Sequence, residues 1–395
     1  MDSKIRRSRF AKRWTRSMQA TYSTPRLLLS KGQGAYLFNS EGSKYVDFLG
    51  GIATNALGHN HPKIVKAVNS QVKKLGHVSN IYAHDPGLAL AENLLKMTGD
   101  DSSRVYFCNS GTEAVEAAIK LSRLTGRKEI ISAHGSFHGR TMGSLSLTAQ
   151  PKKQNPFKPL LKHIKYVKFG DLKSLERKIS RRTAMVILEP IMGEAGVIVP
   201  PNGYLKGARE LCSKYGALLA FDCVQTGMGR TGTWFGYEHE GINPDIITLA
   251  KGIGGGLPLG AMITIGEKSN LFQPGSHGST FGGNPISCAA ANAVISEIKE
   301  KRYLLSNLKK GKLLKESIRD ISGVREVRGR GLLIGIEFTN PIADNVVWKL
   351  EKAGFLINSV NPNTIRIAPS YLIKDSEIKR FTESLREIVG GSLNE

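Results

Sequence analysis

The chain has 395 residues, 40% of them hydrophobic and 23% charged, which suits about two globular domains at ~100 to 200 residues each. Its 43 glycines and 16 prolines show no period, which excludes fibrous and repeat architectures, and no apolar run approaches the ~20 residues of a membrane-spanning helix. The net charge of +23 predicts attraction to anions, but does not distinguish carboxylate metabolites from nucleic acid.

The cysteines occur singly, with no C-x-x-C pair, at Cys108, Cys212, Cys223 and Cys288. This spacing argues against a zinc ribbon, a dithiol redox site and a disulfide framework. We therefore expect a cytoplasmic protein without a metal site.

Residues 1–16, MDSKIRRSRFAKRWTR, are rich in arginine and fit two interpretations. One is a short amphipathic targeting segment, and the other is a solvated basic arm. Asp2 and the lack of a cleavable apolar core favour the arm.

The middle of the chain alternates helical patterns with short strands. Residues 35–49 predict a hairpin around an Asn-Ser-Glu-Gly turn, and from about residue 60 the alternation begins. Strands are expected in SRVYFCNS, KEIISAHG, AMVILEP, GALLAFDCV, DIITLAKG and GAMITIG. This order predicts the α/β class, with a buried, mainly parallel sheet flanked by helices. A helical pattern after Pro285, followed by strands at LLIGIEF and TIRIAP, predicts a smaller C-terminal domain.

A glycine turn precedes one of these helices at Ser110, Gly111, Thr112 and Glu113. Ser110 and Glu113 have the spacing of a capping box, and free backbone N–H groups at a helix N-terminus can bind a phosphate. Taken alone, the segment favours the commoner explanation, an ordinary helix cap.

Two further motifs do not fit the function that they suggest. GMGRTG at residues 227–232 matches the dinucleotide fingerprint, but TWFGYEHEGINPD follows it instead of the helix that would hold a pyrophosphate. His59 and His61 are spaced like two metal ligands, yet a third ligand is not evident and Pro62 opens a helix. A structural role for these histidines is the better interpretation.

Two charged residues lie at the ends of apolar strands. Asp222 ends ALLAFD, where a carboxylate is costly unless it pairs with a buried cation or a hydrogen-bond donor. Lys251 lies between DIITLA and GIGGG, where glycines leave room for a flat ligand. Apolar surroundings lower the pKa of a lysine and free its amine for Schiff-base formation. A salt-bridged core residue is the alternative in each case.

Together these segments resemble the class III pyridoxal-phosphate aminotransferases. The resemblance is carried by TLAKGIGGGLPLGA, FDCVQTGMGRTG, HGSTFGGNP, NSGTEAVEAAIK, SFHGRT and LEPIMGEAGV, and it runs from about Trp14 to the C-terminal helix. Within the class, GIATNALGHNHP and HVSNIY look most like the acetylornithine aminotransferases. The resemblance implies fold type I, with a large cofactor-binding domain at 57–285, a small α+β domain formed by 1–56 and 286–395, and a homodimer with shared active sites.

The resemblance also implies roles around the cofactor, pyridoxal 5'-phosphate (PLP). Lys251 would be the Schiff-base lysine and then the base that moves the proton, and Asp222 would pair with the pyridinium nitrogen. Phe137 would stack on the ring. The other implied contacts are Ser110, Gly111, Thr112, Gln225 and, from the partner subunit, Thr280.

Two anion sites are implied for the substrates, because a terminal amine reacts far from its carboxylate, whereas glutamate reacts at a carbon that bears one. Arg140 would bind the distal carboxylate and Arg366 the one beside the reacting carbon. Glu194 would be a gate that pairs with Arg366 when no carboxylate is there. Ser279 and Tyr82 are the other implied substrate contacts.

The chain departs from the family pattern at two positions. Cys223 stands where the family usually has Glu, and strand alternation predicts that its side chain points away from the face that Asp222 uses. Ala83 follows Tyr82 where relatives often have a second aromatic residue, which could loosen the substrate pocket.

The implied function is transfer of the terminal amino group of N2-acetylornithine to 2-oxoglutarate in arginine biosynthesis. Ornithine, succinylornithine and N-succinyldiaminopimelate are the rival donors, since a few apolar contacts discriminate by only ~1 to 3 kcal/mol. The high net charge and Cys223 leave a hypothesis of another class, a nucleic-acid-binding protein that keeps the fold but has lost catalysis.

Overall fold

The computed structural model describes residues 3–392, and a seven-stranded sheet lies at the centre of this part of the chain. The strand order is β4-β10-β9-β8-β7-β5-β6, and β10 runs antiparallel to both its neighbours while the other neighbouring pairs are parallel. The mainly parallel α/β sheet predicted from the sequence is therefore confirmed. Its strands are β4 (Arg104–Cys108), β5 (Glu129–Ala133), β6 (Ile164–Val167), β7 (Thr183–Leu188), β8 (Leu218–Asp222), β9 (Ile246–Leu249) and β10 (Gly260–Thr264).

Helices cover both faces of this sheet, so every residue of β5, β7 and β8 is buried. On one face α5 (Gly111–Arg123) packs on side chains such as Leu218 and Ala220. On the other face, the residues that alternate with these pack against α4 (Asp85–Thr98) and α9 (Tyr204–Tyr215). Cys223 belongs to that second face, as strand alternation predicts.

Two four-stranded sheets are built from the ends of the chain. The predicted hairpin is present as β2 (Tyr36–Asn39) and β3 (Lys44–Asp47), which pair antiparallel. Parallel pairing of β3 with β13 joins the N-terminal segment to the C-terminal one. The remaining strands are β1 (Leu29–Gln33), β11 (Val324–Arg330), β12 (Leu333–Phe338), β13 (Phe355–Leu356), β14 (Asn358–Asn361) and β15 (Thr364–Ile367).

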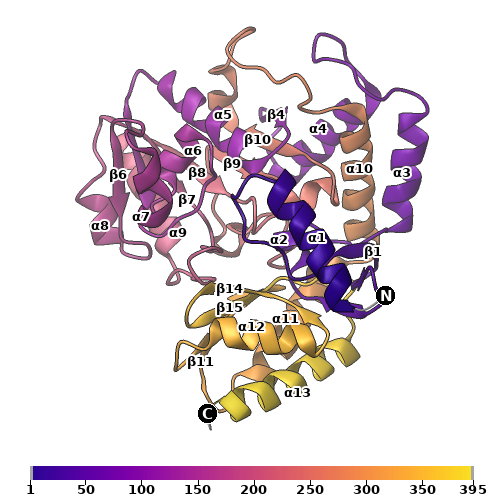
Figure 1. Ribbon diagram of the computed structural model, residues 1–395. Coiled ribbons are helices and arrows are strands. Elements are labelled where there is room, and N and C mark those ends of the chain that lie inside the picture. The colour runs from indigo at the N-terminus through magenta and orange to yellow at the C-terminus, as the bar shows by residue number, and fades with distance from the viewer. Residues whose placement is uncertain (1–2, 393–395) are drawn as a thin grey trace.

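A shared apolar core holds these chain ends together. Phe48 stacks on Phe381 with 4.3 Å between ring centroids, and both also contact Phe355 edge-on. Helix α10 (Pro285–Glu300) contributes to this core and also to the core of the seven-stranded sheet, so it connects the two. Figure 1 shows the C-terminal helices gathered below the seven-stranded sheet. The other α-helices are α1 (Ser3–Ser17), α2 (Gly50–Ala53), α3 (Pro62–Val72), α6 (Met142–Leu147), α7 (Pro151–Gln154), α8 (Leu172–Glu176), α11 (Tyr303–Ile318), α12 (Ala343–Lys352) and α13 (Asp375–Ser392).

The basic N-terminal segment forms α1 from Ser3 onward. Residues 1–2 of the predicted arm lie outside the described part of the chain. Its exposed side chains include Arg9, Lys12, Arg13 and Arg16. Whether it acts as a targeting segment or a solvated arm stays a prediction. Among the described helices, none combines the length and apolar character needed to cross a membrane.

The dinucleotide-like motif and the two histidines have structural roles rather than the functions that they suggest. GMGRTG lies in a run of turns that reaches Tyr237, and only the one-turn 3-10 helix Glu238–Glu240 follows it before β9. His59 Nε2 lies 2.8 Å from a carboxylate oxygen of Asp47, and His61 Nε2 lies 3.7 Å from one of Glu297.

Candidate active site

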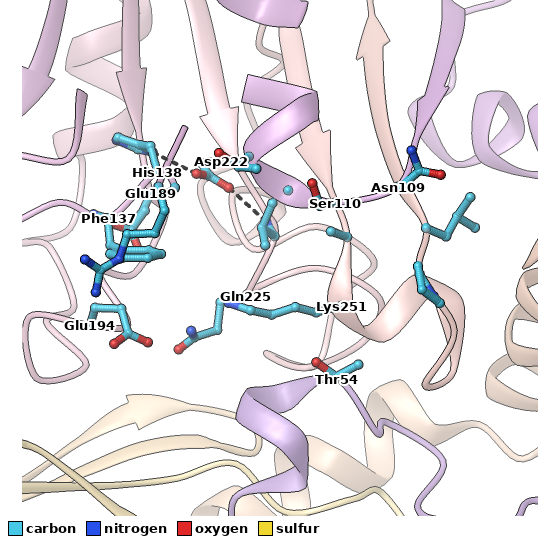
Figure 2. A pocket seen from close by; sticks show the side chains of 18 of the residues that line it. Thr54, Asn109, Ser110, Phe137, His138, Glu189, Glu194, Asp222, Gln225 and Lys251 are labelled. Carbon is cyan, nitrogen blue, oxygen red and sulfur yellow. Dashed lines mark hydrogen bonds and ion pairs between the residues drawn. The ribbon is translucent and has the colours of Figure 1, made fainter. Parts of the chain in front are cut away.

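A cavity of about 460 Å³ opens at the carboxyl ends of the parallel strands. Parallel strands deliver the residues that follow them to one edge of a sheet, where α/β proteins bind ligands. Glu189 follows β7, Asp222 ends β8 and Lys251 follows β9, and all three line the cavity. Figure 2 shows these side chains arranged around one space, with Phe137 and Glu194 at one end and Asn109 at the other.

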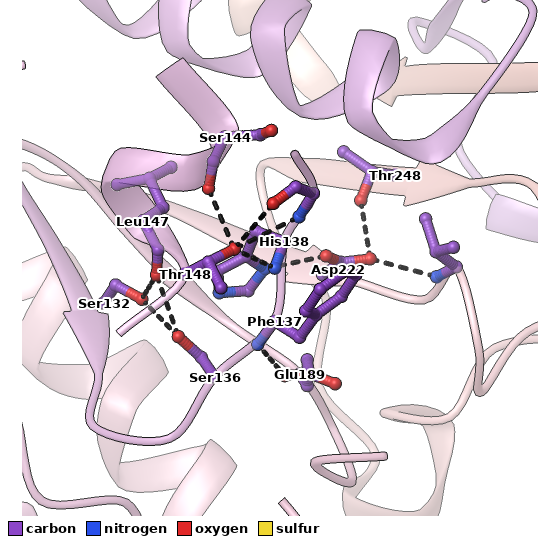
Figure 3. A network of polar contacts seen from close by, with 12 residues as sticks. Ser132, Ser136, Phe137, His138, Ser144, Leu147, Thr148, Glu189, Asp222 and Thr248 are labelled. Carbon is purple, nitrogen blue, oxygen red and sulfur yellow. Dashed lines mark hydrogen bonds and ion pairs between the residues drawn. The ribbon is translucent and has the colours of Figure 1, made fainter. Parts of the chain in front are cut away.

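Asp222 is 4% exposed and is held by three hydrogen bonds. One carboxylate oxygen lies 2.7 Å from His138 Nδ1, and the other accepts the backbone N–H of Val224 and the hydroxyl of Thr248, both at 3.1 Å (Figure 3). The pairing that a carboxylate needs at the end of an apolar strand is therefore present. His138 is also buried, so the pair forms a fixed acidic group at the wall of the cavity.

Glu189 is a second buried carboxylate, which the sequence did not single out. It accepts the backbone N–H of Phe137 at 2.9 Å and that of Gly193 at 3.1 Å. Burial raises the pKa of Glu189 to about 7, and the nearby Asp222 adds to the rise. Through these two contacts Glu189 joins the segment that bears Phe137 to the loop that bears Glu194.

Lys251 begins the short 3-10 helix Lys251–Gly254 in a left-handed conformation, with φ 51°. Such a φ is uncommon outside glycine and often marks a functional site. Burial lowers the pKa of Lys251, and the charge of Arg366 lowers it further against the opposing influence of Glu194 and Asp222. A lysine with a lowered pKa beside a cavity has the properties of an amine nucleophile or a general base.

The N-terminus of α5 lies on the same cavity. Ser110 is the N-cap, and its hydroxyl accepts the N–H of Glu113, as the capping-box spacing predicts. A Cβ on Gly111 would lie 2.8 Å from a methyl carbon of Val224, so only glycine permits this approach to the loop after β8. The hydroxyl of Thr112 contacts Thr141 and Ser144, which ties α5 to the segment that bears Arg140.

The predicted gate pair is in contact. Arg366, on β15, is 1% exposed and donates from Nη1 to Glu194 and, at 3.2 Å, to Gln225. Its other terminal nitrogen donates to Asn358 at 3.3 Å, while its buried Nε has no partner among the described residues. Burial alone would raise the pKa of Glu194, but the charge and hydrogen bond of Arg366 outweigh it, so the pKa lies below its ordinary value.

Three predicted residues lie away from this cavity. Tyr82 is 69% exposed and Thr280 is also exposed, and neither lines the cavity. Ser279 is half-buried, and its hydroxyl accepts from Asn109 at 3.2 Å and from the backbone of Gly282 at 3.0 Å. The predicted residues that do line the cavity are Ser110, Gly111, Thr112, Phe137, Arg140, Glu194, Asp222, Gln225 and Lys251.

The residues fit PLP, the cofactor that the resemblance implies. The first turn of α5 leaves the backbone N–H groups of Gly111 and Thr112 without intrahelical partners, which suits a phosphate. Asp222 presents a buried carboxylate that suits a protonated ring nitrogen, and Lys251 presents an amine to the same cavity. Phe137 adds an aromatic wall.

Comparisons with known proteins agree with this geometry. The family model for aminotransferase class III matches residues 17–389. The acetylornithine aminotransferase of Mycobacterium bovis is 49% identical over 380 residues, which are 95% of each chain.

Solved structures are similar over nearly the whole chain. One of the ornithine aminotransferase from Toxoplasma gondii, with partial occupancy of PLP at its active site, has a TM-score of 0.93 at 29% identity and covers 100% of this chain and 99% of its own. The structure of the N-acetylornithine aminotransferase from Stenotrophomonas maltophilia has a TM-score of 0.83 at 32% identity and covers 97% of this chain and 99% of its own. Fold, cavity and family match together place this chain in the class III family of PLP-dependent aminotransferases.

Proposed function

We propose that this aminotransferase moves the terminal amino group of N2-acetyl-L-ornithine to 2-oxoglutarate, giving N-acetylglutamate 5-semialdehyde and glutamate in arginine biosynthesis. The observation that carries the proposal is the contact between Arg366 and Glu194, with Arg140 separate from it on the same cavity. A donor with its carboxylate far from the reacting CH2 leaves Arg366 to Glu194, whereas glutamate needs Arg366 for itself. The 49% identity to an acetylornithine aminotransferase supports the same donor.

Bound PLP would supply an electron sink for the carbon that loses its proton. Lys251 would hold the cofactor covalently and then, as a free amine, carry that proton between the substrate carbon and the cofactor. Its lowered pKa favours the neutral amine that this step requires. The cofactor would be held in place by Asp222, Gln225, Phe137 and the N-terminus of α5 at Ser110 to Thr112.

The two arginines would divide the substrate carboxylates. Arg140 would bind the distal carboxylate in both half-reactions. Arg366 would bind the carboxylate of glutamate or 2-oxoglutarate beside the reacting carbon, and Glu194 would move aside for it. When the terminal amine is bound instead, Glu194 would neutralise Arg366, because an unpaired buried guanidinium is costly.

A homodimer completes the proposal. Thr280, Ser279 and Tyr82 would act in the active site of a second subunit. Their position outside the lining of this cavity supports that role, as does the exposure of Tyr82 and Thr280. We also propose the division into a large domain, 57–285, and a small domain formed by 1–56 and 286–395, supported by the apolar core that the chain ends share. A cytoplasmic location fits the four buried, unpaired cysteines.

The test is a panel of terminal-amine donors with 2-oxoglutarate, with kcat/KM measured for each. We expect N2-acetylornithine to exceed free ornithine, succinylornithine and N-succinyldiaminopimelate. A clear preference for ornithine would overturn the proposed donor. Ornithine is the second candidate because the fold matches the Toxoplasma gondii ornithine aminotransferase so closely.

A further inference from the structure

Besides Arg140, a second cation, Lys153, lies near Phe137, and the proposed function gives Lys153 no role. Lys153, on α7, is half-buried and donates a hydrogen bond from Nζ to the side chain of Gln150. The amide nitrogen of Gln150 in turn donates to the backbone of Gly135 at 2.9 Å and of Ser136 at 3.3 Å, immediately before Phe137. The ammonium is thus anchored to the segment that carries the aromatic wall.

Arg140 and Lys153 converge on the same ring. The guanidinium carbon of Arg140 and Nζ of Lys153 each lie 5.7 Å from the centroid of Phe137. Neither forms an ion pair with a carboxylate of the described residues, and Glu194, whose charge reaches Lys153, is held by Arg366. Burial lowers the pKa of Lys153, and repulsion by Arg140 lowers it further. Two positive charges therefore lie beside Phe137, and the nearby carboxylate of Glu194 is paired with Arg366 rather than with either of them.

We propose that Lys153 is a specificity-determining residue, which acts with Arg140 to favour donors whose distal end carries net negative charge. The inference rests on the proposed function and deepens it, because it names the chemical class of donor. Lys153 does not line the cavity, so it acts through its charge rather than by contact. Salt screens charge–charge interactions much less at a partly buried site than at an exposed one, so the charge of Lys153 can act without contact.

The physical reason lies in the charge at the distal end of each donor. Free ornithine has an ammonium beside its distal carboxylate, so the end that reaches Arg140 has no net charge. N-acetylation removes the ammonium and leaves a net charge of about −1, and N-succinylation adds a further carboxylate. A nearby positive charge attracts these ends in the order succinyl, acetyl, free amine. Lys153 thus favours acylated donors over the free diamino acid.

The experiment replaces Lys153 by Gln and measures kcat/KM for succinylornithine, N2-acetylornithine and ornithine. Lys152→Gln is the matched control, because Lys152 is the exposed neighbour on the same helix and its loss changes the net charge equally. We expect the ratio of acetylornithine to ornithine to fall by about three- to tenfold in Lys153→Gln, which is the size of a partly screened charge interaction. Succinylornithine should lose most, and Lys153→Arg should restore the ratios.

The outcomes separate this inference from the proposed function. Equal ratios in Lys153→Gln and Lys152→Gln, with the wild type still preferring acetylornithine, would overturn the inference alone. A wild type that prefers ornithine would overturn the proposed donor whatever Lys153 does. A loss of activity toward all three donors in equal proportion, or ratios that Lys153→Arg does not restore, would show a merely structural role and also overturn the inference.

Discussion

The inner wall of the cavity, which is formed by Glu189, Asp222 and Lys251, differs in exposure from the outer segments at residues 77–84 and 276–283. Asp222 and Glu189 are 4% and 6% exposed, and Asp222 accepts three hydrogen bonds while Glu189 accepts two. In the outer segments, Ile81 is 83% exposed and Tyr82 is 69% exposed. The inner wall is thus fixed by contacts within one chain, whereas the outer segments leave apolar side chains exposed, as the proposed homodimer requires.

The outer segments are nevertheless ordered with respect to each other. Asn80 donates to the backbone of Gly282 at 3.0 Å, and a ring nitrogen of His84 lies 2.9 Å from the carbonyl of Gly283. A preformed shape with exposed apolar side chains is what a subunit interface requires. The comparison teaches that buried, fixed carboxylates and an exposed apolar surface occur in the same chain, and under the proposed homodimer both would belong to one active site.

The strongest test of the inner wall is Lys251→Ala. Turnover should fall by at least about 10⁴-fold, because the change removes covalent attachment and the general base together. The protein should still fold and hold PLP through the N-terminus of α5, which melting temperature and equilibrium dialysis would show. More than a trace of transamination would mean that another lysine does this work.

Asp222→Asn should lower kcat by about 10² to 10³-fold, as removal of one preorganised electrostatic group does. Its amide cannot stabilise a protonated ring nitrogen as the carboxylate does. Asp245→Asn is the control, since Asp245 also lies beside β8 and pairs with Arg209 at 2.7 Å, outside the residues that line the cavity. It should lower stability while kcat stays near the wild-type value, and similar kcat losses in both variants would contradict the assignment.

In the outer segments, Thr280→Ala should raise the dissociation constant of PLP by about tenfold, the worth of one hydrogen bond to a charged group. Thr339→Ala, at an exposed threonine elsewhere, is the control. The effect requires the dimer, so sedimentation should show a dimer for the wild type. An unchanged PLP affinity in a dimeric Thr280→Ala protein would remove Thr280 from the site.

The smallest effect is on stability, at Glu189. Burial raises its pKa to about 7, so between ~4.3, its unfolded value, and 7 the folded chain binds the proton more tightly. The free energy of unfolding of the wild type should therefore decrease as pH rises through this window. Glu189→Gln removes that decrease. The melting temperature of the variant minus that of the wild type should therefore rise between pH 5 and pH 8. A constant difference would contradict the raised pKa.

The sequence predicts the inner wall better than the outer segments. Asp222 and Lys251 stand out because a charge at the end of an apolar strand needs an explanation, and Glu189 follows AMVIL in the same way but was missed. His138 was missed because its position depends on folding, which brings it to Asp222 across 84 residues. Ser279, Thr280 and Tyr82 came from the family resemblance, since residues in turns outside the cavity carry no sequence pattern that points to a partner subunit.

The most direct measurement of the central claim is the pair of single-turnover rates for Glu194→Ala, one with glutamate and one with N2-acetylornithine. Without Glu194, Arg366 stays unpaired and open to carboxylates beside the reacting carbon. We predict that the glutamate half-reaction is preserved or faster, while the acetylornithine half-reaction slows by about tenfold, because its CH2 end then faces an uncompensated cation. Equal losses in the two half-reactions would contradict the gate and the dual-substrate account that depends on it.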